Sequence, residues 1–107
     1  MQAGKLRHRI DIQRAEEGKN EHGETILLWS TLATRWGSIE PLQGRELFEA
    51  QQVKPEITTR VRLRHYDGLT PKDRLRPHGT TRTLEIEAVI NPAERDHEME
   101  ILCRERS

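Results

Sequence analysis

The residue types that most often carry chemistry are present in this chain, but they are scattered. Its 107 residues include five histidines and a single cysteine, Cys103. None of them has the close spacing of zinc ligand pairs, such as Cys-x2-Cys or His-x3-His. Cys103 falls on the apolar side of a predicted strand, where a thiol is usually a small buried hydrophobic group. The sequence therefore predicts neither a metal site nor a nucleophilic cysteine.

Other catalytic patterns are also missing from the sequence. The glycines are isolated, whereas a phosphate-binding loop needs them clustered. None of the three serines lies in the strand–turn–helix setting of a nucleophile elbow. Carboxylates are plentiful, but their spacing marks no catalytic pair. We therefore expect a protein that is not an enzyme and that uses no cofactor.

One polar feature has a definite shape, the row formed by Arg60, Arg62 and Arg64. In a strand these side chains share one face, about 6–7 Å apart. The row could contact phosphates, or it could form ion pairs with glutamates of neighbouring strands. Apart from Tyr66, no aromatic residue nearby could stack on bases, so we favour ion pairs, within or between subunits. The glutamates considered as partners are Glu85, Glu87, Glu98 and Glu100.

These residues lie in a chain whose hydrophobic pattern repeats mostly every second residue, as in half-buried strands. The predicted strands cover residues 6–14, 25–30, 34–40, 57–65, 73–76, 82–90 and 98–105. Only residues 45–52 consist largely of helix formers. The pattern predicts a mainly β protein, a small antiparallel barrel or sandwich of six to seven strands. One short helix lies in an insertion at about residues 41–56, and residues 1–107 form a single domain.

Strand parity also predicts which side chains meet in the core. The inward set is Leu6, Ile10, Ile12, Trp36, Ile39, Val61, Leu63, Leu84, Ile86, Ile101 and Cys103. Residues 16–24 contain two glycines and no apolar residue. We expect this segment to be a mobile hairpin tip, because nothing in it can be anchored by burial.

The composition narrows the class of protein. Charged residues make up 34%, yet 18 basic and 18 acidic groups cancel, which argues against indiscriminate nucleic-acid binding. The core is lean, since only 23 residues are Leu, Ile, Val or Phe, so association would be a natural supplement to stability. The single cysteine suits a reducing compartment, and no segment has the length of a membrane span or the pattern of a signal peptide.

Charge is segregated along the chain. Residues 51–82 carry a net charge of +5 and residues 83–107 a net charge of −4. Two such regions could pair within one fold or between neighbouring copies. Rings in which each copy meets the next need two different complementary surfaces of this kind.

The predicted helix carries a small apolar patch, because Leu47 and Phe48 are adjacent. The patch could pack on the chain's own barrel, or it could dock on a neighbouring subunit or another protein. In the second case Glu46 and Glu49 would face solvent or a channel. Acidic groups there would repel DNA phosphates and let a duplex slide. Arg45 opens the same stretch.

Four segments, taken together and in order, resemble one family. They are GKLRHRIDIQR at residues 4–14, WGSIEPLQGRE at 36–46, PEITTRVRLR at 55–64 and VINPAERDHEME at 89–100. The chain is similar in these segments to the head–tail adaptor family of tailed bacteriophages and prophages, also called head closure or head–tail joining proteins. The resemblance covers nearly the whole chain.

The resemblance implies a virion structural protein, assembled in the host cytoplasm and located in the neck between head and tail. Such relatives form a ring, commonly dodecameric, beneath the portal. The ring extends the DNA channel, closes the filled head and provides the platform for the tail. The implied partners are further copies of the chain, portal or adaptor proteins, a tail-completion protein, and passing DNA bound without sequence specificity. No membrane is implied.

In some relatives the insertion between two strands lines or plugs the channel, and by position it corresponds to residues 41–56 here. The helix-forming content of this stretch disfavours a plug made of paired strands. Two other functions remain open. One is a tail-completion protein one ring further down the neck. The other is a small nucleic-acid-binding barrel that uses the arginine row.

Overall fold

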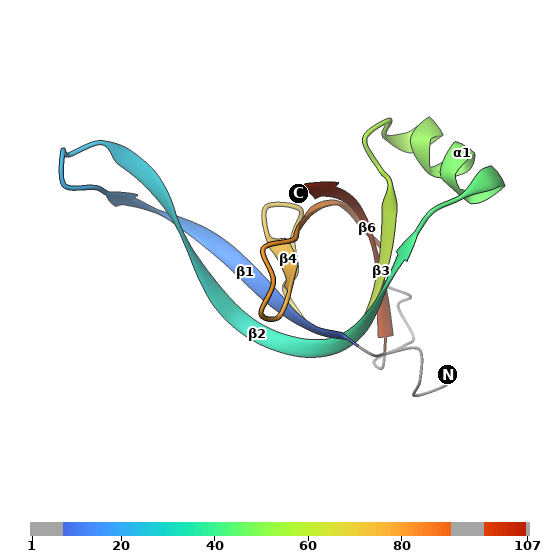
Figure 1. The fold of residues 1–107 in the computed structure, drawn as a ribbon, viewed down its shortest axis with the longest axis horizontal. Coiled ribbons are helices and arrows are strands. Elements are labelled where there is room, and N and C mark those ends of the chain that lie inside the picture. Colours follow the sequence, from blue (N-terminus) through green and yellow to red (C-terminus); the bar gives the residue numbers. More distant parts are fainter. Residues whose placement is uncertain (1–7, 91–97, 107) are drawn as a thin grey trace.

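A computed structural model describes residues 8–90 and 98–106, which form a closed barrel of six antiparallel strands and one helix (Figure 1). The strands are β1 (His8–Lys19), β2 (Thr25–Pro41), β3 (Thr59–Arg64), β4 (Arg74–Pro77), β5 (Thr83–Ile90) and β6 (Glu98–Arg106), and the helix is α1 (Gly44–Val53). Around the barrel the strands follow the order β1-β2-β3-β6-β5-β4. The predicted mainly β class is confirmed. The predicted core residue Leu6 lies outside the described residues.

The barrel core is built by the alternation that the sequence shows. Eight residues of the predicted inward set are buried: Ile10, Ile12, Val61, Leu63, Leu84, Ile86, Ile101 and Cys103. Leu75 and Met99 complete the cluster, and Ile39 is partly buried against it. Inward side chains of β1, β3, β4, β6 and the first half of β5 are fully or almost fully buried, so the strand parities predicted from the sequence are correct for most of the barrel.

Trp36 is the exception, and its predicted place in the core is wrong. Its side chain is 51% exposed on the outside of the barrel, where the Arg9 guanidinium lies 5.9 Å from the ring centre. The inward position belongs to its neighbour Gly37. A Cβ atom there would lie 2.5 Å from the carbonyl oxygen of Arg62 and 2.8 Å from the side chain of Leu63. Only glycine lets β2 pass this close to β3, and the alternation then turns Trp36 outward.

Strands β1 and β2 continue beyond the barrel as a two-stranded ribbon. We call residues 15–30 the arm, because β1 pairs with β4 only as far as Gln13. The arm extends far to one side in Figure 1, and it gives the molecule extents of 47 × 28 × 27 Å. A β-bulge between Ile12 and Gln13 in the register marks its base. Two separate strands were expected at 25–30 and 34–40, but β2 runs through both.

The turn at the end of the arm is shorter than predicted. Glu16 and Lys19, expected in the hairpin tip, belong to β1, and the connection begins at Asn20. The Asn20 side-chain oxygen accepts hydrogen bonds from the backbone N–H groups of His22 and Glu24. Backbone pairing with β2 extends β1 through residues that have no apolar side chain to bury, a contribution that hydrophobic patterning does not reveal.

The helix α1 lies between β2 and β3, as predicted, on the opposite side of the barrel from the arm (Figure 1). Gly44 opens it with a positive φ of 59°, a conformation that favours glycine. A second, smaller cluster holds the helix in place. It consists of Leu42, Ala50 and Ile57, with Leu47 and Leu102 packed against it. The part of the chain that the structure describes has no helix long and apolar enough to cross a membrane.

Candidate functional site

The arginine row lies on the outer face of β3, because Val61 and Leu63 point into the core. Its three members differ in their partners. Arg60 donates hydrogen bonds to Glu46 on α1 and, at 2.9 Å, to Glu40 on β2. The hydrogen bond from Arg60 holds the pKa of Glu40 below its ordinary value. Arg60 therefore links β3 to α1 through Glu46 and to β2 through Glu40. Neither glutamate was among the expected partners.

The other two arginines of the row face the expected strand. In the register of β3 with β6, Arg62 lies opposite Glu100 and Arg64 opposite Glu98. Among residues 8–90 and 98–106, no carboxylate lies within ion-pair distance of either guanidinium. Arg62 and Arg64 thus retain hydrogen-bonding capacity on the outside of the barrel.

The helix divides its apolar patch between two environments. Leu47 packs on the second cluster, whereas Phe48 is 67% exposed. Arg45 and Glu49 face outward as a solvent-exposed pair at 3.8 Å, which contributes little to stability. Glu46, expected to face solvent or a channel, is bound to Arg60. Packing on the chain's own barrel therefore applies to Leu47, whereas docking on a neighbouring subunit or another protein stays a prediction for Phe48.

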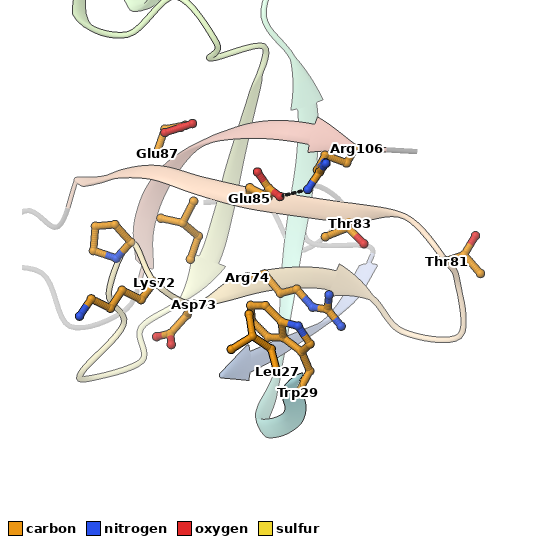
Figure 2. A pocket seen from close by; sticks show the side chains of 12 residues that line it. Leu27, Trp29, Lys72, Asp73, Arg74, Thr81, Thr83, Glu85, Glu87 and Arg106 are labelled. Atoms are coloured by element: carbon orange, nitrogen blue, oxygen red, sulfur yellow. Dashed lines mark hydrogen bonds and ion pairs between the residues drawn. The ribbon is translucent and has the colours of Figure 1, made fainter. Parts of the chain in front are cut away.

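A groove separates the arm from the outer face of β4 and β5, and sequence reasoning did not find it. Its volume is about 760 Å³, and Figure 2 shows Leu27 and Trp29 of the arm beside Arg74 of β4. The Arg74 guanidinium lies 4.0 Å from the Trp29 ring centre, a cation–π contact. Four consecutive apolar residues at 26–29 were a usable signal, since a ribbon that projects from a barrel cannot bury both of its faces.

Charged side chains line the far side of the groove and its ends. Glu85 accepts hydrogen bonds from Arg104 and Arg106, and these bonds lower its pKa despite its partial burial. Arg74 donates to Gln13 and makes no ion pair to a carboxylate in the described chain. Burial and the nearby Arg76 lower the pKa of Arg74. The charged lining is balanced in number, but each of its carboxylates is already held by a basic side chain. Lys72 and Arg74 have no carboxylate partner in the described chain, so the groove combines an apolar wall with two unpaired cations.

The geometry suits binding through charge and apolar surface. Burial raises the pKa of the Cys103 thiol, so this group is held protonated inside the core. Over the described ranges, no three histidine, cysteine, aspartate or glutamate side chains are grouped as metal ligands. The histidines with acidic partners, His65 and His78, each lie beside a single aspartate.

Comparison with known proteins identifies the family. Residues 1–106 match the model of the family described as phage head completion protein. The solution structure of protein SF1141 from Shigella flexneri 2a is similar, with 28% identity, a TM-score of 0.71, and coverage of 98% of this chain and 96% of that one. A chain of the native gene transfer agent virion has the same fold at 15% identity, with a TM-score of 0.55 and 92% of each chain covered. No curated protein matches. The family match spans all six strands and the helix, so this chain belongs to the phage head completion protein family.

Proposed function

We propose that this protein closes the phage head after DNA packaging, as a ring beneath the portal that extends the DNA channel and receives the tail. The observation that carries the proposal is the family match over residues 1–106. The surfaces of the described residues support it, because this small barrel exposes apolar side chains at both ends of its long axis. Exposed apolar patches of this kind usually mark sites of contact with other proteins.

The helix α1 is the element that we assign to contact with a neighbouring subunit or neck protein. Leu47 and the ion pairs of Arg60 fix the helix on the barrel, so Phe48 is presented on a rigid support. Burial of an exposed phenylalanine side chain contributes roughly 1.5–3 kcal/mol to association. Val53, also exposed, extends this patch at the end of the helix.

The charges beside the patch suit a channel through which DNA passes. Glu49 is exposed and would repel phosphates, whereas Glu46 is neutralised by Arg60. Arg62 and Arg64 would pair with acidic groups of adjacent subunits, or with Glu98 and Glu100 after small side-chain movements. This arrangement would let DNA slide without specific binding.

A phage or prophage from which this chain has been deleted tests the proposal. We expect its heads to package DNA and then to lose it, with tails left unattached, and electron microscopy and nuclease protection of the DNA measure both defects. Wild-type protein supplied in trans should restore filled, tailed particles. Tailed infectious particles without the chain would refute the proposal, and heads that keep their DNA but lack tails would indicate the tail-completion role instead.

A further inference from the structure

The arm is both acidic and apolar. Residues 15–30 contain four glutamates and one lysine, a net charge of −3. On the face that points away from the groove, Glu16 lies opposite Leu28, which is 52% exposed. Leu28 lies over Gly18, where a Cβ atom would be 2.4 Å from its Cδ1 atom. This face of the arm is therefore a flat, partly apolar surface with acidic neighbours.

The outer face of the barrel on the other side of the groove has the opposite charge. It is formed by β4, Arg82 with β5, and the end of β6, and it carries five arginines and three glutamates, a net charge of +2. These residues are Arg74, Arg76, Arg82, Arg104, Arg106, Glu85, Glu87 and Glu105. The three glutamates are already engaged by basic side chains, whereas Lys72 and Arg74 at the groove have no carboxylate partner in the described chain.

We propose that the arm of one copy docks in the groove of the next copy, with Glu16 facing the unpaired cations Lys72 and Arg74 and Leu28 facing the Leu27–Trp29 wall. Opposite charges and matching apolar surface favour a second copy of this chain as the occupant. The arm and the groove are different surfaces of one chain, so every copy can give one and receive one, which is the contact that builds a ring. The inference rests on the proposed ring and identifies its subunit interface.

Nucleic acid is the competing occupant, since phosphates would also match the unpaired cations Lys72 and Arg74. A phosphate backbone would leave Leu27 and Leu28 in water, however, and it would give the acidic arm no role. A second copy would bury these apolar side chains and would also pair the acidic arm with the cations of the groove. The two occupants differ in what a charge change on the arm does, because the arm would repel DNA but attract the next subunit.

Self-association of the full chain tests the interface. Sedimentation analysis at protein concentrations up to about 1 mM covers even weak contacts. We expect Glu16→Lys and Lys72→Glu each to weaken the association about tenfold, because each reverses one charge at the contact. The combined variant Glu16→Lys/Lys72→Glu should recover most of the loss, since the reversed arm then meets a reversed groove on the next copy.

Two controls carry the same charge changes away from the interface. Asp67→Lys lies in an exposed turn, and Arg9→Glu lies on the outside of β1 beside Trp36. Neither should change the association by more than about twofold, beyond the general effect of salt. Equal weakening by the controls, or no recovery in the combined variant, would overturn the interface.

A wild-type chain that remains monomeric over the whole concentration range would also overturn it. If Lys72→Glu abolishes retention of duplex DNA while self-association is unchanged, the groove binds DNA and the inference is wrong. None of these results depends on head closure. Protein that restores filled, tailed particles but fails the charge-reversal series would remove this interface and leave the proposed function intact.

Discussion

Gly37 shows how a single residue determines whether the barrel can close. A methyl group at this position would meet the backbone carbonyl of Arg62 and the side chains of Ile10 and Leu63 at less than 3 Å. The backbone of β3 cannot move away without breaking its pairing with β6. A side chain at residue 37 would therefore overlap both the backbone of β3 and the core.

We expect Gly37→Ala to lower the free energy of unfolding by about 1–3 kcal/mol or more, as overpacking of a core does. Urea unfolding followed by circular dichroism measures the change. Gly18→Ala is the matched control, because its added Cβ would meet only the flexible end of Leu28. Equal losses in the two variants would show that the loss comes from replacing a glycine in a strand and not from overpacking at Gly37.

Asp73 is the most enclosed carboxylate in the barrel. It is buried, and it accepts hydrogen bonds from the Arg14 guanidinium at 2.8 and 2.9 Å and from the Thr70 N–H at 3.0 Å. Burial alone would raise its pKa, but the bonds from Arg14 and Thr70 outweigh burial and lower the pKa of Asp73 below the ordinary aspartate value. The ionised form is therefore the one that stabilises the fold.

A pH dependence of stability follows from this lowered pKa. The contribution of Asp73 is complete above the unfolded-state pKa of about 3.9 and is lost as the pH falls through the lower folded-state value. We expect Asp73→Asn to cost about 1–3 kcal/mol at neutral pH and to flatten the loss of stability below pH 4. Thermal unfolding between neutral pH and pH 3 measures both effects. Asp67→Asn, on an exposed aspartate, should change neither.

At the scale of elements, α1 separates stability from binding within two adjacent residues. Leu47→Ala should loosen the helix from the second cluster and lower the unfolding midpoint, because it removes buried contacts. Phe48→Ala should leave the free energy of unfolding within about 0.5 kcal/mol of the wild-type value, as surface changes usually do. Head closure or tail attachment should nevertheless weaken. Unfolding melts and particle counts distinguish the two variants. Loss of folding in Phe48→Ala would mean that this side chain supports the barrel.

The elements also show what hydrophobic patterning can predict and where it stops. Strand β3 alternates strictly between apolar and polar residues, and parity was correctly predicted there, in β6 and in the first half of β5. A bulge between Ile86 and Ala88 shifts the register in the second half of β5, so Val89 packs against the core and Ile90 is exposed. The arm was underestimated, because its residues are held by backbone pairing and a bulge rather than by burial. The apolar run at residues 26–29 signals an exposed apolar surface, but the position of the groove could not be predicted, since it depends on how the arm lies over β4. Trp36 was misplaced because it was assigned to the same face as Ile39, although residues three apart in a strand point to opposite faces.

At the scale of the whole molecule, the barrel and the arm are separable. The buried cluster of the barrel contains no residue from 15–30. We expect replacement of residues 16–28 by an Asn-Gly turn, which joins the cross-strand pair Ala15 and Trp29 and so keeps the register, to leave the barrel folded with its cooperative unfolding intact. Self-association should be lost. Nuclear magnetic resonance spectra and sedimentation test the two outcomes, and an unfolded product would show that the arm supports the barrel.

Leu63→Ala is the counterpart of that change, because it affects the core and leaves the arm unaltered. Leu63 is fully buried where β2, β3 and β6 meet. We expect a loss of roughly 2–4 kcal/mol in the free energy of unfolding, measured by urea titration. An unchanged midpoint would remove Leu63 from the set of residues that hold the barrel together.

The arm has one more property, which concerns the behaviour of the protein before assembly. Along residues 15–30 each strand has a hydrogen-bonded neighbour on one side only, so both outer edges offer free backbone donors and acceptors. Such edges can recruit strands from other chains and seed aggregates, especially beside Leu27 and Leu28. Glu16, Glu17 and Lys19 line the outer edge of β1, and like charges on approaching copies discourage that pairing. Neutralising these side chains would therefore bring a risk of insoluble protein before any particle is built.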